Sequence, residues 1–180
     1  DELIAGRLGP AEAVRYRRYS GGGWQTMQGA VIREAPVTVF VNQKELVTIL
    51  CTPLRINHLV LGFLCNEGVI SGLGDVAMMR VCDEEATVDV RLNGAAPELV
   101  VHRTLTSGCG GAYSIADAIR DLAPVRATLT VTPEQVLALI KQLQVAATLF
   151  RRYGGVHTAA LAEAGRLLAV AEDVGRHNTI

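Results

Sequence analysis

The sequence has few cysteines and almost no net charge, and each shortage excludes a class of protein. The four cysteines are scattered without a Cys-x-x-Cys pair, so neither a zinc knuckle nor a thioredoxin-type dithiol is expected. Seventeen basic residues against eighteen acidic ones leave a net charge of −1. This balance argues against a nucleic-acid or membrane-surface partner recognised through overall charge, although local basic clusters are still allowed.

Long apolar runs are also missing. The longest, Leu59 to Cys65, is far short of the roughly 20 residues that span a bilayer, and we expect no signal peptide at the start. We therefore expect a cytoplasmic protein without a membrane segment. Its 180 residues, 49% of them hydrophobic, can build one medium domain or two small ones around a buried core.

The most reactive position is Cys109, which lies between Gly108 and Gly110-Gly111, so neither neighbour shields its sulfur. The stretch from Ser114 to Asp117 has the spacing of a capping box and predicts a helix that begins there. A helix N-terminus favours negative charge and lowers the pKa of a nearby thiol, and the thiolate is the reactive form. Cys109 is therefore the predicted nucleophile.

The first half of the chain predicts a small sheet covered by a helix. Residues 1–24 are expected to form a surface arm and a flexible turn, whose basic and aromatic stretch Arg15 to Tyr19 either contacts a phosphate or acidic partner or is simply solvated. Alternation of apolar and polar residues predicts strands at Met27 to Arg33, Val37 to Val41, Glu45 to Leu50, Val76 to Cys82, Thr87 to Leu92 and Leu99 to His102.

Between these strands, Thr52-Pro53 predicts the start of a helix that covers the sheet and ends at Glu67-Gly68. His58 in this helix is interpreted as a partly buried structural histidine rather than a catalytic one. Cysteines and methionines in apolar periodic segments are expected in the core. These are Cys51, Cys65, Cys82, Met78 and Met79.

In the second half, Thr132-Pro133 and Gln135 predict the start of a long amphipathic helix that continues through Phe150 and ends at Gly154-Gly155. A hairpin of Val156 to Ala162 and Leu167 to Ala171 should follow. Its second arm leads into the polar run Glu172 to Asn178.

Three glycine-containing turns carry charged or reactive groups, and we expect them to meet in one site: Thr106 to Gly111, Gly154 to His157, and Glu172 to Asn178. Any one of these alone would be an ordinary turn. In a shared site, the cationic side chains of His157, Arg176 and His177 could stabilise a thiolate or persulfide of Cys109 and bind an anionic ligand. Glu172 and Asp173 could orient these cations, or could cap the helix that follows.

The same motifs resemble the formate dehydrogenase accessory protein family, FdhD. The resemblance runs from about Ala30 to the last residue, and its most specific part is Glu-Asp-Val-Gly-Arg-His-Asn at 172–178. The other matching motifs are Gly154-Gly155-x-His157, Thr52-Pro53 with Gly62-Phe63-Leu64 and Glu67-Gly68, and Ser107-Gly108-Cys109-Gly110-Gly111.

The resemblance implies an α/β fold, α+β overall, with a small N-terminal α+β part followed by a domain like that of cytidine deaminases. The expected division is an arm at 1–24, an α+β subdomain at 25–105 and an incomplete deaminase-like domain at 106–180, because the family continues past Ile180. It also implies a homodimer.

In function, the resemblance implies a sulfur carrier that takes persulfide sulfur from a cysteine desulfurase and sulfurates bis-molybdopterin guanine dinucleotide for formate dehydrogenase. The resemblance assigns the persulfide to Cys109, and we expect His157, Arg176 and His177, with Gly110 and Gly111, to bind the cofactor. Many members have a second cysteine at the position of Ala112, so a single persulfide would have to suffice here.

Two other functions follow from the same resemblance: a non-catalytic chaperone that binds and delivers the molybdenum cofactor, and a structural accessory subunit that docks on formate dehydrogenase. Zinc-dependent deamination is set aside, because it requires His-x-Glu and Pro-Cys-x-x-Cys. Here His157 is followed by Thr158-Ala159, and no cysteine pair exists.

Overall fold

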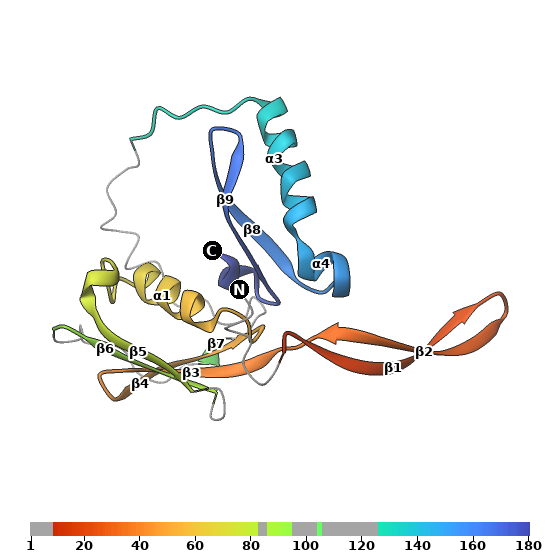
Figure 1. Cartoon of the computed structure of the whole chain (residues 1–180), viewed down its shortest axis with the longest axis horizontal. Coiled ribbons are helices and arrows are strands. Elements are labelled where there is room, and N and C mark those ends of the chain that lie inside the picture. The colour runs from red at the N-terminus through yellow and green to blue at the C-terminus, as the bar shows by residue number, and fades with distance from the viewer. Residues whose placement is uncertain (1–8, 83–85, 95–103, 106–125) are drawn as a thin grey trace.

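The computed structural model describes residues 9–82, 86–94, 104–105 and 126–180, and these residues form a mixed α+β fold (Figure 1). A five-stranded sheet with one covering helix makes up one part. A hairpin with two further helices makes up another, and a long two-stranded ribbon extends to one side. The expected α+β class is therefore confirmed, whereas the likeness to cytidine deaminases stays a prediction.

The five-stranded sheet has the order β5-β6-β3-β4-β7. Its strands are β3 (Ala35–Val41), β4 (Lys44–Cys51), β5 (Val76–Cys82), β6 (Thr87–Leu92) and β7 (Thr104–Leu105). β3 pairs antiparallel with β4 across a tight turn at Asn42 and Gln43, both with positive φ, and parallel with β6. The four longer strands lie where alternation predicts them, whereas the strand expected at Leu99 to His102 lies outside the described residues.

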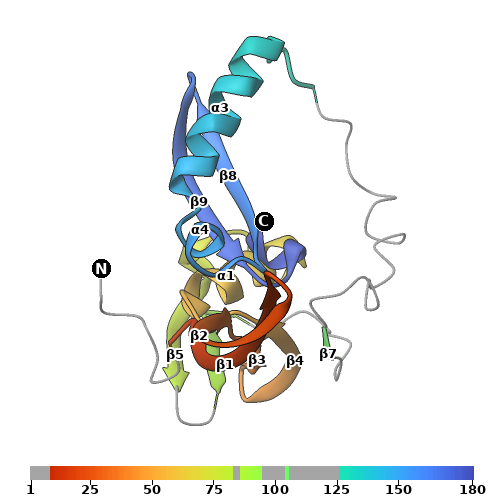
Figure 2. The same ribbon diagram turned by 90° about the vertical axis from the view of Figure 1, so that its right-hand side faces the viewer.

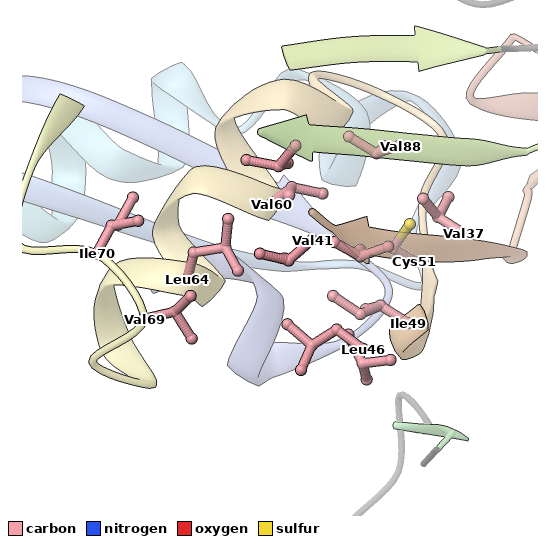
Figure 3. Packing of buried hydrophobic residues seen from close by; sticks show 13 residues of the cluster. Val37, Val41, Leu46, Ile49, Cys51, Val60, Leu64, Val69, Ile70 and Val88 are labelled. Carbon is pink, nitrogen blue, oxygen red and sulfur yellow. The ribbon is translucent and has the colours of Figure 1, made fainter. Parts of the chain in front are cut away.

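The core lies between this sheet and helix α1 (Ile56–Asn66). Val60 and Leu64 of α1 are fully buried and face the apolar side chains of the sheet (Figure 3). The strand residues in the core include Val37, Val39, Val41, Ile49, Cys51, Val88 and Val90.

Helix α1 begins later than the sequence predicts. Its N-cap is Arg55 in a left-handed conformation (φ 52°), and Thr52 lies three residues earlier. The prediction of a Thr52 cap is wrong because the Thr52 hydroxyl accepts a hydrogen bond from the distant Val174 N–H instead. The predicted end is confirmed, since Glu67 is the C-cap and Gly68 has φ 70°.

Several side chains are more exposed than the sequence predicts. His58 is exposed and lies 3.0 Å from the Asn57 side-chain oxygen, so the prediction of a partly buried histidine is wrong. Cys65 and Met78 are also exposed and are not core residues. Among the three cysteines that the structure describes, Cys51 is fully buried and Cys82 is partly buried.

The N-terminal arm is a regular ribbon. Strands β1 (Ala11–Ser20) and β2 (Gly23–Ile32) pair along their whole length across the turn Gly21-Gly22, whose φ values are 60° and 80°. Apart from a contact between β2 and helix α4 (Thr148–Tyr153), the ribbon extends away from the sheet and from the helices (Figures 1 and 2). Residues 11–24 are thus largely exposed, as expected of a surface arm with a glycine turn, but the pairing of β1 with β2 was not predicted.

The second half contains α3 (Pro133–Ala146), α4 (Thr148–Tyr153), β8 (His157–Glu163) and β9 (Arg166–Asp173), with short 3₁₀ turns η1 (Leu73–Asp75) in the first half and η2 (Arg176–Thr179) at the end. The capping box is confirmed, since Thr132 and Gln135 bond reciprocally. The single long helix is wrong: Ala147 breaks it into α3 and α4. α3 lies along the β8–β9 hairpin (Figure 1), and none of the helices in the described ranges is long and apolar enough to cross a bilayer.

Candidate functional site

The end of β9 is held by a buried carboxylate. Asp173 is only 5% exposed, and its Oδ1 accepts hydrogen bonds from the Gly175 N–H and from Asn178 Nδ2, both at 2.7 Å. Its Oδ2 accepts a third from the Thr52 N–H at 2.9 Å. The carboxylate thus joins two parts of the chain that are 121 residues apart.

Thr52 and Asn178 complete this connection. The Thr52 hydroxyl accepts from the Val174 N–H at 3.0 Å, and Asn178 Nδ2 also donates to the Leu50 carbonyl at 3.0 Å. Buried polar groups are stable only when they are paired, so this set fixes the turn against the end of β4. Arg176 and His177 follow that fixed turn and are exposed to solvent.

Burial raises the pKa of Asp173, although the hydrogen bonds from Gly175, Asn178 and Thr52 act against that rise. The sequence left two roles open for this residue, orienting the cations or capping the next helical turn. Its bond to the Gly175 N–H, two residues along the chain, stabilises the local turn, whereas η2 has no side-chain cap hydrogen bond, so both roles stay predictions.

Glu172 stabilises a different element. Its carboxylate accepts from the N–H groups of Leu149 and Phe150, both at 2.9 Å, and from the Thr148 hydroxyl at 3.1 Å. These are the unpaired donors at the start of α4. Glu172 therefore caps α4 from another part of the chain. The backbone N–H groups that it binds lack a partner within a helix because the helix is interrupted at Ala147.

The glycine turn before β8 comes close to the same place. Gly154 and Gly155 both have positive φ (68° and 69°), so this turn favours glycine. It places His157 at the first position of β8, where it is exposed and lies opposite Asp173 in the hairpin. The structure thus brings together two of the three segments that the sequence assigned to one site.

The third segment, with Cys109, Gly110 and Gly111, lies outside the described residues, as does the helix expected from Ser114. Their roles therefore stay predictions. Cys51 lies next to the buried network, but burial, with smaller effects of Asp173 and Glu34, raises its thiol pKa to about 12. Cys51 is consequently a neutral thiol at physiological pH and no nucleophile.

Sequence reasoning missed the contribution of Thr52 and Leu50, since Thr52-Pro53 also fits a helix start. The available signal was a polar residue directly after a buried strand, where backbone groups of another segment can be paired. In the part of the chain that the structure describes, no three side chains of His, Cys, Asp or Glu come together as a metal site. The arrangement presents exposed imidazole and guanidinium groups on a fixed backbone, which suits an anionic ligand.

A comparison with protein-family models matches residues 32–180 to the FdhD/NarQ family. The chain is 31% identical over 173 residues to "Sulfur carrier protein FdhD" of Listeria innocua, and 32% identical over 170 residues to the protein of the same name in Bacillus subtilis. These alignments cover 92% and 91% of this chain but 66% and 64% of the relatives. The chain therefore spans slightly less than two thirds of their length.

Among solved structures, the chain is similar to a putative formate dehydrogenase accessory protein from Desulfotalea psychrophila, with a TM-score of 0.74 and 21% identity. The match covers 94% of this chain and 65% of that one. At this identity the likeness supports the fold.

Proposed function

The chain belongs to the FdhD/NarQ family, and on this premise we propose that it carries sulfur on Cys109, from a cysteine desulfurase to the bis-molybdopterin guanine dinucleotide cofactor of formate dehydrogenase. Two observations carry the proposal. The sequence contains a cysteine flanked by glycines, and the structure contains a fixed turn followed by the exposed residues Arg176 and His177. The names of the relatives, sulfur carrier proteins, support the same reaction class.

The loading step is an exchange between thiolate and persulfide. The Cys109 thiolate attacks the outer sulfur of the donor persulfide, one S–S bond forms, another breaks, and the donor leaves as a thiolate. No external oxidant or reductant is required, because the transferred sulfur keeps its oxidation level. Ala112 stands where a resolving cysteine could lie, so the persulfide would persist on Cys109 until it is passed on.

The second step requires an anionic cargo to be bound near Cys109. The pyrophosphate groups of a guanine dinucleotide suit the exposed side chains of His157, Arg176 and His177. Asp173 and Glu172 would act indirectly, since they fix the backbone on both sides of these groups. Glycines 110 and 111 would let the loop approach both partners.

We place this activity in the cytoplasm, where thiols stay reduced, and in a homodimer. The alternative is a cofactor chaperone in which Cys109 only lines the binding site. A chaperone would deliver cofactor equally well after Cys109 is replaced, whereas a carrier would not.

The deciding experiment is intact-mass spectrometry after incubation with a cysteine desulfurase and cysteine. The wild-type protein should gain about 32 Da, reversible by reductant, as expected for a persulfide. Cys109→Ser should not gain this mass. The structure supplies a matched control in Cys65→Ser, since Cys65 is an exposed thiol outside the turns around Asp173.

Retention of the gain in Cys65→Ser and its loss in Cys109→Ser would support the carrier. An equal gain in Cys109→Ser, or none in the wild type, would remove the carrier reading and leave the chaperone. Delivery of active cofactor to formate dehydrogenase by Cys109→Ser would point the same way.

A further inference from the structure

The outer part of the β1–β2 ribbon is a concentrated positive charge on a nearly neutral chain. Residues 13–32 contain Arg15, Arg17 and Arg18 and no acidic residue, which leaves 14 basic and 18 acidic residues elsewhere, a net charge of −4. All three arginines are exposed, and within the described ranges none of them forms an ion pair. The ion pair of the ribbon, Arg33 with Glu12 at 3.7 Å, lies at its base.

The two faces of the ribbon differ. Because side chains alternate along a strand, Arg15, Arg17 and Tyr19 share one face, and the register places Trp24 on it opposite Tyr19. The Arg17 guanidinium lies 5.0 Å from the centre of the Trp24 ring, and the rings of Tyr19 and Trp24 are 5.3 Å apart. We call these four residues the basic–aromatic face.

The opposite face has a structural use for its aromatic residue. A side chain built on Gly29 would meet the Tyr16 ring at 3.0 Å, so that ring already fills the space above this glycine. Such an aromatic residue compensates for a glycine in a strand. Tyr19 and Trp24 cover no such gap, and they are about 60% exposed.

A ribbon of this kind needs something to pack against. Two strands alone are marginally stable in water, and three strands or a packed face are required for independent stability. Within the residues that the structure describes, β1 pairs with β2 alone, and the ribbon extends clear of the sheet (Figures 1 and 2). Its ten-residue strands nevertheless keep full register.

The composition of the exposed face identifies the class of partner. Tryptophan, tyrosine and arginine are the residue types that dominate binding energy at protein–protein interfaces. Nucleic acid fits less well, because the ribbon offers only three positive charges and the rest of the chain, at −4, would repel phosphates. An acidic protein surface meets both the charge and the aromatic side chains.

We propose that the basic–aromatic face docks on an acidic surface of the protein that donates sulfur to this chain. The identity of the partner rests on the proposed function: the loading of Cys109 requires contact with the persulfide of another protein, whereas the cofactor is a small molecule. Positive charge on a projecting ribbon would also speed the encounter at low ionic strength.

The first test measures affinity for a purified cysteine desulfurase from the same organism. Arg15→Glu with Arg17→Glu should weaken binding by about 30-fold or more, as expected for interface hot spots, and Trp24→Ala by about 10-fold. The matched control is Arg91→Glu with Arg166→Glu, which reverses two exposed charges on β6 and β9, outside the ribbon, and should leave affinity unchanged. Binding by the wild type should weaken as salt is added.

The second test separates docking from chemistry by loading Cys109 from two donors. With polysulfide, a small donor, the ribbon variants should gain sulfur as fast as the wild type. With the desulfurase they should load at least 10-fold more slowly. Circular dichroism before and after loading shows whether each variant is folded, and Trp24→Phe provides a milder change if the double variant is not.

Equal affinity and equal loading from the desulfurase in all ribbon variants would overturn the docking proposal and leave the carrier function intact. Failure of the wild type to load from either donor would instead overturn the proposed function, and the affinity measurement would then judge the docking alone. Two further measurements test other occupants of this face: sedimentation detects self-association, and a binding assay with mixed-sequence DNA detects nucleic-acid binding. If the ribbon variants lose self-association or DNA binding while the desulfurase binds normally, another occupant uses this face and the proposal is wrong.

Discussion

Replacing Asp173 by asparagine tests whether one buried carboxylate fixes the turn that carries Arg176 and His177. The carboxylate accepts three hydrogen bonds, two on Oδ1 and one on Oδ2, whereas an asparagine side chain has a single acceptor oxygen. If that oxygen takes the Oδ1 position, the amide nitrogen faces the Thr52 N–H, a second donor. One buried N–H is then unpaired, at a cost of about 1–3 kcal/mol.

A second effect opposes this cost. Burial raises the pKa of Asp173, which means that the folded protein stabilises the charged form less well than water does. Asparagine removes that charge, which offsets part of the decrease in the free energy of unfolding. We therefore expect Asp173→Asn to lower the free energy of unfolding by about 1–2 kcal/mol at pH 7, the lower part of that range, and Asp173→Ala, which leaves three donors unpaired, by more than about 3 kcal/mol.

The same pKa shift sets the pH dependence. A group whose pKa is raised by folding contributes most to stability below its unfolded value, here 3.8, and loses that contribution as the pH rises through the folded value. Asparagine does not titrate. The difference in unfolding free energy between wild type and Asp173→Asn should accordingly shrink as the pH is raised from about 4 towards neutrality.

Urea unfolding followed by circular dichroism measures these differences. Asp75→Asn is the matched control, because Asp75 is exposed and accepts one backbone bond, from Ser71 at 2.7 Å. It should cost less than about 1 kcal/mol. If Asp173→Asn and Asp173→Ala cost no more than the control, the three-bond reasoning is wrong. If the difference between wild type and Asp173→Asn grows with pH, burial does not raise the pKa of Asp173.

Two glycine substitutions and one labelling experiment test other contacts in the structure. Gly175→Ala places a Cβ 2.7 Å from Asn178 Nδ2, so the amide must give up its bonds to Asp173 and Leu50. We expect a loss of about 1–3 kcal/mol in urea unfolding, whereas Gly62→Ala, in an open position of α1, should stabilise by about 0.5–1 kcal/mol. An unchanged midpoint for Gly175→Ala would contradict the close contact. In the native protein at pH 8, iodoacetamide should label exposed Cys65 but not Cys51, whose pKa is raised to about 12 mainly by burial; modification of both at similar rates, read by peptide mass, would refute that burial.

The local part of this fold could be predicted from the sequence. Strands β3 to β6 follow from alternating apolar residues, because a strand with one buried face repeats every two positions. The start of α3 follows from Thr132 and Gln135, whose reciprocal bonds involve only neighbouring residues. The turns at Gly68 and Gly154-Gly155 follow from glycine at positive φ.

Side-chain environments were predicted less well. Cys65, Met78 and His58 lie in apolar segments, yet each points to solvent. Composition identifies a buried segment, but which of its residues face the core depends on strand register and on helix rotation against the sheet. The ribbon was missed for a related reason, since its exposed arginines hide the pairing of β1 with β2.

For the candidate site, the sequence by itself determined which residue types are available: a cysteine among glycines, and the run Glu172 to Asn178 that marks the family. Only the tertiary structure decided what the carboxylates do. Asp173 pairs with Thr52 and Glu172 with the start of α4, because chain folding brings these unpaired backbone donors to them across long sequence separations. A hydroxyl or carboxylate binds whichever buried donor comes within reach, and that donor is chosen by the packing of the whole chain.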